Sequence, residues 1–208
     1  MCDDSPVLAR RRSQAERRSE AEAALLKAAV RIVAERGLER LTLADVGEAA
    51  GYSRGLPAHY FGSKDGLTGA LAMHIVRNFG RGVNRADKHA PGFERLLAMM
   101  TLYFDSARKD PLTTRALHAV LGEAITNAAL RETIADLNAR SAAAIEDSIR
   151  AGIAVGEVRS DVNAHVTAIL ILSAIRGAVA QWLTDERGID LNMLRDEFLD
   201  GLKRRLRA

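Results

Sequence analysis

The sequence predicts an all-α protein of about nine helices, and three observations lead to that prediction. Hydrophobic residues make up 48% of the 208 residues and aromatic residues only 4%, with alanine and leucine prominent. Apolar residues recur at helical spacing in one segment after another, and no segment of any length alternates as a strand does. The chain has only four prolines, so few segments are barred from helix formation. Its length allows one large or two small domains.

The first 18 residues have no apolar pattern and carry five arginines, which are Arg10, Arg11, Arg12, Arg17 and Arg18. Such a run fits either a solvated tail or an arm that contacts the phosphates or a groove of a nucleic acid. The net charge of +3 is too small to decide between them. Because a candidate DNA-binding motif follows, we interpret residues 1–18 as a flexible basic arm.

The first helix is expected over residues 20–35. Ser19 and Glu22 have the spacing of a capping box, and apolar residues from Leu25 to Val33 form one face. Gly37 is expected to end the helix.

Residues 42–61 have the pattern of a helix-turn-helix. Thr42 is expected to cap a short helix, with Asp45 in the capping-box position. Gly51 is expected to end that helix, because glycine adopts a left-handed conformation without steric cost. Ser53 is expected to cap a second short helix that ends at Gly62. Such a pair normally places its second helix in the DNA major groove, and we assign residues 19–66 to a DNA-binding domain.

The segment TLADVGEAAGYSRGLPAHYFGSKDGL resembles the DNA-binding segment of TetR-type (tetracycline repressor-like) transcriptional regulators. The shared pattern is a Thr-capped helix, an alanine-glycine turn, Ser with a basic residue and Gly, an aromatic-rich helix ending in Phe, and Ser-Lys-Asp-x-Leu. Two positions depart from the pattern: Pro57 replaces an aliphatic residue, and Ala58 replaces a tyrosine that often reaches a phosphate. The resemblance implies about nine helices, of which the first three bind DNA, and an effector-binding and dimerisation domain over residues 67–208.

The second helix of the motif is expected to present its side chains to DNA. Arg54 and Leu56 are placed to reach base edges, and Gly55 allows close approach. Thr42 and Lys64 lie at helix N-termini, where backbone amides attract phosphate. The predicted DNA-contacting residues are Arg10, Arg11, Arg12, Thr42, Ser53, Arg54, Gly55, Leu56, His59, Tyr60 and Lys64.

Further helices are predicted from apolar spacing and from caps. Asp110 with Pro111, and Asn127, mark two helix starts, and Ser160 or Asp161 is expected to cap a later one. A loop is expected over residues 80–92. One expected helix begins at residue 111, and the others span residues 64 to about 78, 93–109, 128 to about 154, 162 to about 184 and 191–206.

The helix over residues 162–184 has almost no polar face, so it must be buried on all sides. It is either a central core helix or a helix shared between its own core and a second subunit. The resemblance implies that the last two helices pair with those of a second copy, and helix-turn-helix proteins usually act as two-fold dimers. The predicted interface residues are Ile171, Ile175, Val179, Leu194, Phe198 and Leu202.

The middle helices carry methionines and aromatic residues that are usually ordinary core. The resemblance raises the expectation that some of them enclose a small apolar or amphipathic effector. The predicted lining residues are Met73, Phe79, Met99, Met100, Tyr103, Phe104, His118 and Leu121.

No catalytic, cofactor or metal site is predicted. The five histidines are scattered without metal-ligand spacing, and the single cysteine, Cys2, excludes a disulfide within one chain. The glycines near residue 51 follow no strand and match no phosphate loop. The start of the chain does not read as a signal peptide, and the apolar run at residues 168–175 is too short to span a bilayer, so a soluble cytoplasmic protein is expected.

These observations predict a homodimeric, sequence-specific regulator of transcription that binds a palindromic operator in double-stranded DNA. We expect a repressor that an effector releases. One alternative is a DNA-binding regulator without effector, whose C-terminal domain only dimerises. A second is a helical enzyme or carrier with a purely structural helix pair, which Arg54, His59 and Tyr60 argue against.

Overall fold

The computed structural model describes residues 13–83 and 90–208, apart from the side chains of residues 79–83. This part of the chain forms nine helices, in agreement with the predicted fold class, and its only β pairing is an isolated bridge between Val158 and Arg207. The helices are α1 (Gln14–Arg36), α2 (Leu43–Ala49), α3 (Leu56–Phe61), α4 (Lys64–Val83), α5 (Phe93–Lys109), α6 (Pro111–Glu123), α7 (Ala128–Ala154), α8 (Ala164–Thr184) and α9 (Leu191–Leu206).

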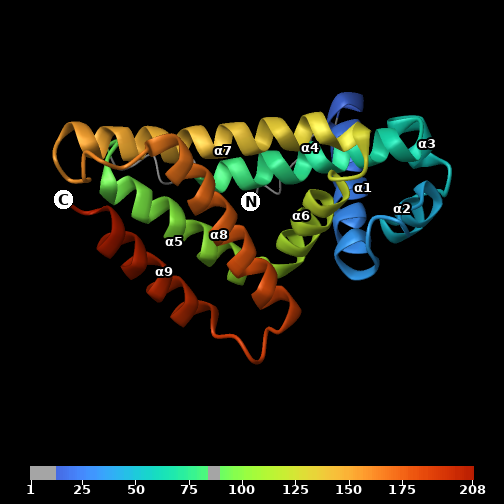
Figure 1. Cartoon of the computed structure of the whole chain (residues 1–208). Helices are drawn as coiled ribbons and strands as arrows, with labels where there is room; N and C mark the ends of the chain where they lie inside the picture. Colours follow the sequence, from blue (N-terminus) through green and yellow to red (C-terminus); the bar gives the residue numbers. More distant parts are fainter. Residues whose placement is uncertain (1–12, 84–89) are drawn as a thin grey trace, which may run out of the picture.

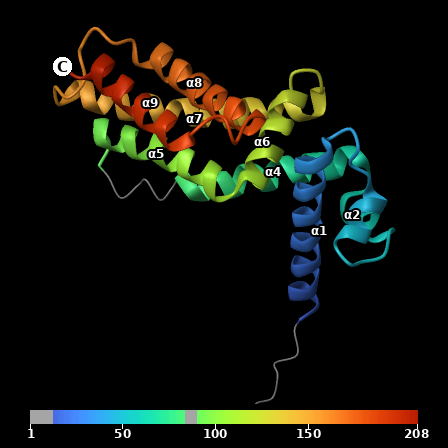
Figure 2. The same ribbon diagram turned by 90° about the horizontal axis from the view of Figure 1, so that it is seen from below.

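The first three helices lie together at one end of the molecule (Figure 1). Helix α4 leads away from them along the long helix α7, while α5, α8 and α9 gather at the opposite end. Figure 2 shows α1 standing across the direction of α4 and α7, with α2 beside it. The candidate DNA-binding helices are therefore far from α9 and joined to the other helices through α1 and α4.

Two hydrophobic clusters form the core. The first joins α1 and α2 to α4, α6 and the beginning of α7, with Leu25, Leu71 and Leu117 among its buried residues. The second joins α5, the later part of α7, α8 and α9 around Phe104 and Ile149. Because α6 and α7 complete the cluster that holds α1, the core does not divide at the predicted boundary between residues 66 and 67.

Helix α1 begins earlier than predicted. Its cap is Ser13, whose Oγ accepts the Glu16 N–H at 3.1 Å while the Glu16 carboxylate accepts the Ser13 N–H at 2.7 Å. Ser19 with Glu22 offers the same spacing, but nothing in residues 14–19 interrupts a helix, so the first capping box prevails. Residues 14–18 are thus helical and not part of a flexible arm.

Two other boundaries also differ from the prediction. Helix α4 continues to Val83, five residues past Asn78 and into the expected loop. Helix α8 is capped by Asn163, whose Oδ1 accepts the Val166 N–H at 3.1 Å, and not by Ser160 or Asp161. The Asp161 carboxylate is instead held by the Arg159 guanidinium at 2.7 and 3.0 Å.

Candidate nucleic-acid interface and regulatory helices

The turn between α2 and α3 is built on caps and glycines. Thr42 caps α2 as predicted, with its Oγ1 accepting the Asp45 N–H at 3.1 Å. Gly51 has a φ of +79°, the left-handed conformation expected at the end of this helix. The Tyr52 N–H then donates to the Gly47 carbonyl at 2.9 Å and closes the turn.

Gly47 lets α2 and the start of α3 pack closely. A Cβ on Gly47 would lie 2.5 Å from the Ser53 carbonyl oxygen and 3.1 Å from Cδ of Pro57. The sequence analysis missed this residue, although a glycine inside a predicted helix weakens that helix and can therefore indicate close packing.

Helix α3 begins at Leu56 and not at Ser53. Its N-cap is Gly55, which makes no side-chain bond, and Pro57 is the second helical residue. Proline is tolerated in a first turn because it needs no intrahelical donor there, and Pro57 is buried. The prediction of a Ser53 cap was therefore wrong; the Ser53 carbonyl accepts the Leu56 N–H at 3.1 Å in a turn that precedes the helix.

An exposed surface runs over the turn and the outer side of α3. Ser53, Arg54, Gly55 and His59 are all exposed, and the Arg54 side chain is 72% accessible. Its guanidinium lies 4.0 Å from the Glu48 carboxylate. Tyr52 adds an exposed aromatic ring that the sequence analysis did not include.

Other predicted DNA contacts are engaged within the protein. Leu56 and Tyr60 pack against the first core cluster, and the Tyr60 hydroxyl donates to the Arg18 carbonyl at 3.3 Å. The Arg18 guanidinium also lies 5.8 Å from the centre of the Tyr60 ring. These contacts hold α3 against α1, so Tyr60 has a structural role in positioning α3.

Lys64 opens α4, and its Nζ donates to the Glu39 carbonyl at 2.7 Å. Ser63 caps this helix as expected, with its Oγ accepting the Gly66 N–H at 3.1 Å. Arg10, Arg11 and Arg12 lie outside the described residues.

Helix α8 turns the residues predicted for a subunit interface toward the core of its own chain. Ile171, Ile175 and Val179 are at most 4% exposed and pack in the second core cluster. On the outside, Val166, Ile169 and Leu170 are 46–49% exposed. A helix apolar all round does not reveal which side its own core occupies, and burial of the outer side stays a prediction that depends on a second subunit.

On α9, Leu202 is buried, while Leu194 and Phe198 are half-buried against the second core cluster. The Phe198 and Phe104 rings meet edge to face, with centroids 5.7 Å apart. Helix α8 is long and apolar enough to cross a membrane by length and composition alone, but residues along it pack in this cluster.

Most of the residues predicted to line an effector site lie inside the molecule. Met99, Met100, Tyr103 and Phe104 are buried in the second core cluster. Leu121 is half-buried against the first cluster, and His118 is half-buried on α6. Met73, in contrast, is 42% exposed. Phe79 lies in α4, but its side chain falls outside the described part of the chain.

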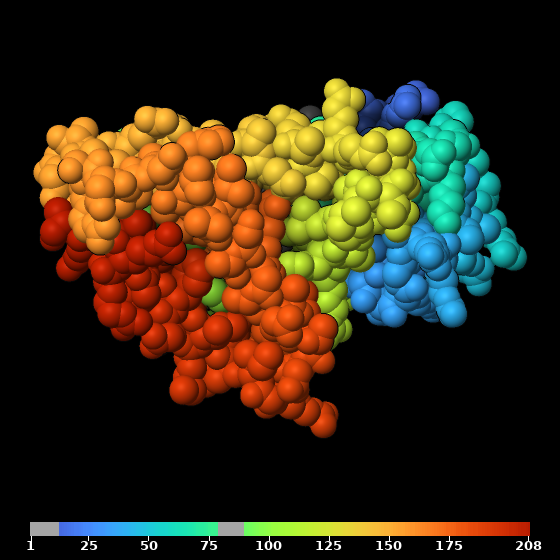
Figure 3. All heavy atoms as spheres, viewed as in Figure 1, coloured from blue at the N-terminus to red at the C-terminus, as the bar shows by residue number. Residues whose placement is uncertain are grey.

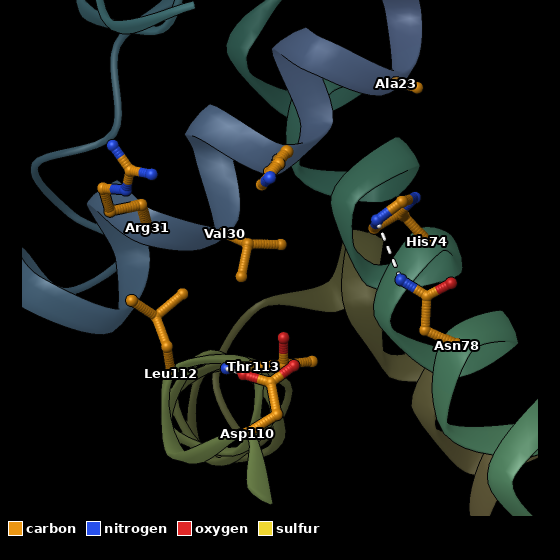
Figure 4. Close-up of a pocket in the computed structure, with 9 residues that line it drawn as sticks. Ala23, Val30, Arg31, His74, Asn78, Asp110, Leu112 and Thr113 are labelled. Carbon is orange, nitrogen blue, oxygen red and sulfur yellow. Dashed lines mark hydrogen bonds between the residues drawn. The ribbon is translucent and has the colours of Figure 1, made fainter.

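A cleft of about 480 Å³ lies where α1 meets α4 and α6. Figure 4 shows Val30 and Leu112 on one side of it and the hydrogen-bonded pair His74 and Asn78 on the other. None of the predicted effector-lining residues borders this cleft. Among residues 13–83 and 90–208, no three His, Cys, Asp or Glu side chains form a group that could hold a metal ion.

Comparisons with known proteins match both halves of this structure. The family described as bacterial regulatory proteins, tetR family, matches residues 25–71, which contain the helix-turn-helix. The family described as BetI-type transcriptional repressor, C-terminal, matches residues 93–207, more than half of the chain. The chain belongs to the TetR family of bacterial transcriptional regulators.

Individual relatives of this TetR-family chain agree with that assignment. It is 39% identical over 85 residues to the HTH-type transcriptional regulator BetI of Brucella suis biovar 1 (strain 1330), an alignment that covers 40% of this chain and 43% of the relative. The chain thus spans less than half the length of this curated relative.

Solved structures resemble nearly the whole chain, and two of them are 26% identical to it. A putative transcriptional regulator from Saccharomonospora viridis in complex with choline has a TM-score of 0.81 and 26% identity, over 91% of this chain and 99% of that one. A putative TetR-family regulator from Rhodococcus sp. has a TM-score of 0.75 and 26% identity, over 88% and 97%. Because the family consists of transcriptional regulators, the predictions of the family, of an all-α fold and of a protein that is not an enzyme are confirmed.

Proposed function

We propose that this TetR-family protein is a cytoplasmic homodimer that represses transcription by binding a palindromic operator in double-stranded DNA, and that a small molecule releases it. The observation that carries the proposal is the outward face of the helix-turn-helix. Ser53, Arg54 and His59 are exposed on a unit whose inner face is fully packed. A helix pair that served only to support the fold would gain nothing from such a face.

The exposed side of α8 supports a dimer. Val166, Ile169 and Leu170 form an apolar patch, and Ala174 and Gly177 continue it along the same helix. Figure 3 shows α8 and α9 next to each other on one face of the molecule. Exposed contiguous apolar surface of this kind marks a site of protein association, and a two-fold pair would present two recognition helices to successive major grooves. The patch on α8 replaces Ile171, Ile175 and Val179 as the proposed interface.

Release by a small molecule is supported by the structure with choline bound to a similar regulator. The alternative is a regulator without effector, in which α4 to α9 serve only to dimerise. Binding of a small molecule that changes the affinity for DNA separates the two functions, because a ligand with equal affinity for both states would shift nothing.

A selection of bound duplexes from random DNA tests the proposed function. We expect an enriched inverted repeat with half-sites about 34–36 Å apart, or a suitable multiple. Arg54→Ala should then weaken binding to the selected site by about 1–3 kcal/mol while binding to random DNA changes much less. Arg131→Ala, which removes an exposed charge on α7, is the matched control. If no sequence is enriched, the chain is not a sequence-specific regulator.

A further inference from the structure

The only charged side chain on α8 other than the histidine at its start is Arg176, which is half-buried. Within the described part of the chain, its Nη1 donates to Asn138 Oδ1 at 2.5 Å, and its guanidinium lies beside the Tyr103 hydroxyl. The Asn138 amide does not ionise, and burial raises the pKa of Tyr103 to about 12, so neither neighbour carries a negative charge at neutral pH. Arg176 therefore has no anionic partner among the described residues.

Two buried polar atoms near this guanidinium also have no hydrogen-bond partner among the described residues. They are Nε of Arg176 itself and Nε2 of His118. Burial, with a smaller effect of Arg176, lowers the pKa of His118, so its ring adds no second positive charge. Buried polar groups in folded proteins are nearly always paired, and a buried charge without a counter-charge is costly. Because Nε of Arg176 carries an N–H, the guanidinium lacks an acceptor there, and no ion-pair partner among the described residues balances its charge.

A cleft of about 460 Å³ between α7 and α8 leads to Arg176. Asn138 and Arg176 form one end, and Glu146 with His165 forms the other, eight residues or about 12 Å along α7. The wall between them is apolar and small, with Ala139, Ala142 and Ala143 on α7 facing Ile169 and Leu172 on α8. This volume lies within the range of small-molecule sites, about 300–1,000 Å³.

The two ends of the cleft differ in charge balance. The Glu146 carboxylate accepts hydrogen bonds from Arg150 Nε and His165 Nδ1, both at 2.9 Å. The hydrogen bonds from His165 and Arg150 lower the pKa of Glu146, and the positive charge of Arg150 balances its carboxylate. The guanidinium of Arg176 has no such compensation, so the cleft attracts an anion and repels a cation at that end.

We propose that the cleft between α7 and α8 binds a small amphipathic carboxylate, whose head group pairs with Arg176 and whose hydrocarbon chain lies on the alanine wall. The proposal rests on the proposed function, since it assigns a chemical class to the effector. The proposed ligand has the opposite charge to the choline bound by the similar regulator. In this chain a quaternary ammonium would lie against an uncompensated guanidinium. Helix α4 packs on α7 and leads to α3, so a ligand between α7 and α8 has a direct route to the DNA-binding unit.

The test is direct binding of octanoate to the full chain without DNA, measured by calorimetry and thermal shift. Choline and octyltrimethylammonium serve as probes of opposite charge. Octanoate should bind and raise the Tm, and Arg176→Met should weaken its binding at least about tenfold, as expected for the loss of a charge-assisted contact. Arg140→Met is the matched control, because it removes an exposed charge on α7 whose ion-pair partner among the described residues is Asp136, and it should bind octanoate as the wild type does.

Two further variants keep the test informative if Arg176→Met does not fold. Arg176→Lys keeps the charge and should retain octanoate, whereas Ala143→Phe fills the cleft without touching Arg176 and should abolish octanoate binding. The inference is overturned if either cation binds more tightly than octanoate. It is also overturned if these substitutions dissociate the dimer and leave octanoate affinity unchanged, since the partner protomer would then fill the cleft, which shares Ile169 and Ser173 with the exposed side of α8.

Failure of the proposed function gives a different result. Octanoate that binds through Arg176 but leaves the affinity for the selected operator unchanged supports the carboxylate site and removes effector release from the function. Release of DNA by choline, with no binding of octanoate, supports effector release and overturns the carboxylate site.

Discussion

The helix-turn-helix and α8 were both predicted to present a surface to an external partner. The two differ in whether the residues predicted for that surface are exposed. In the helix-turn-helix, Arg54 and His59 lie on the exposed side as expected. In α8, Ile171 and Ile175 face the protein's own core, while the neighbouring residue Leu170 is 48% exposed. Arg54 and His59 are thus accessible to a partner, whereas Ile171 and Ile175 are not.

The difference arises because local sequence features orient the helix-turn-helix, whereas tertiary packing orients α8. The orientation of α2 and α3 follows from local features, namely the Thr42 cap, the left-handed Gly51 and the buried Pro57. Helix α8 offers no such features, since its apolar residues surround the axis and any side can face inward. Packing against α5, α7 and α9 makes the choice, and that packing is not encoded within the helix itself.

The largest expected effect comes from substituting two adjacent residues of α8. Ile171→Glu should cost more than about 2–5 kcal/mol, because it removes a buried apolar side chain and places an unpaired carboxylate in the core. Leu170→Glu should change the stability of the folded monomer by no more than about 0.5 kcal/mol but separate the proposed dimer. Chemical denaturation and light scattering measure the two effects.

A dimeric Leu170→Glu protein would move the interface away from the exposed side of α8. Equal destabilisation by the two substitutions would mean that α8 has no exposed side in solution. The control is Gln14→Glu, the same change of charge at an exposed residue of α1, which lies at the other end of the molecule from α8 and α9 (Figure 1).

The fold was predictable because caps and stop residues mark most helices. Asp110 with Pro111, and Asn127, start α6 and α7 as expected. Errors arose where two signals compete, as between the capping boxes at Ser13 and Ser19. The charge imbalance at Arg176 could not be predicted, because Arg176, Tyr103 and His118 come from three helices that only the tertiary fold brings together.

A smaller effect is expected at Gly47, which tests whether close packing of α2 on α3 holds the exposed surface in place. Gly47→Ala should cost about 1–3 kcal/mol, because the new Cβ would lie 2.5 Å from the Ser53 carbonyl oxygen. DNA affinity should fall with it, since the turn that carries Arg54 must shift.

Gly69→Ala in α4 is the control, because a Cβ there meets nothing within 4 Å and should stabilise the helix by about 0.5–1 kcal/mol. Thermal unfolding and DNA titration together decide the matter: if Gly47→Ala keeps both wild-type stability and wild-type affinity, the close contact is not required.

The smallest expected effect concerns the pH dependence of stability and the polar group formed by Tyr103, His118 and Arg176. Burial and the nearby Arg176 lower the pKa of His118 from its ordinary 6.5. The unfolded chain then binds more protons than the folded chain as the pH falls below 6.5, so this group destabilises the folded state on the acid side and has no effect above that value. The Tm should fall when the pH is lowered from about one unit above 6.5 to about one unit below it, and His118→Gln should reduce that fall. His59→Gln, which changes an exposed histidine of α3, should leave that fall as it is in the wild type. An identical acid-side loss in His118→Gln and wild type would show that His118 is not held neutral beside Arg176.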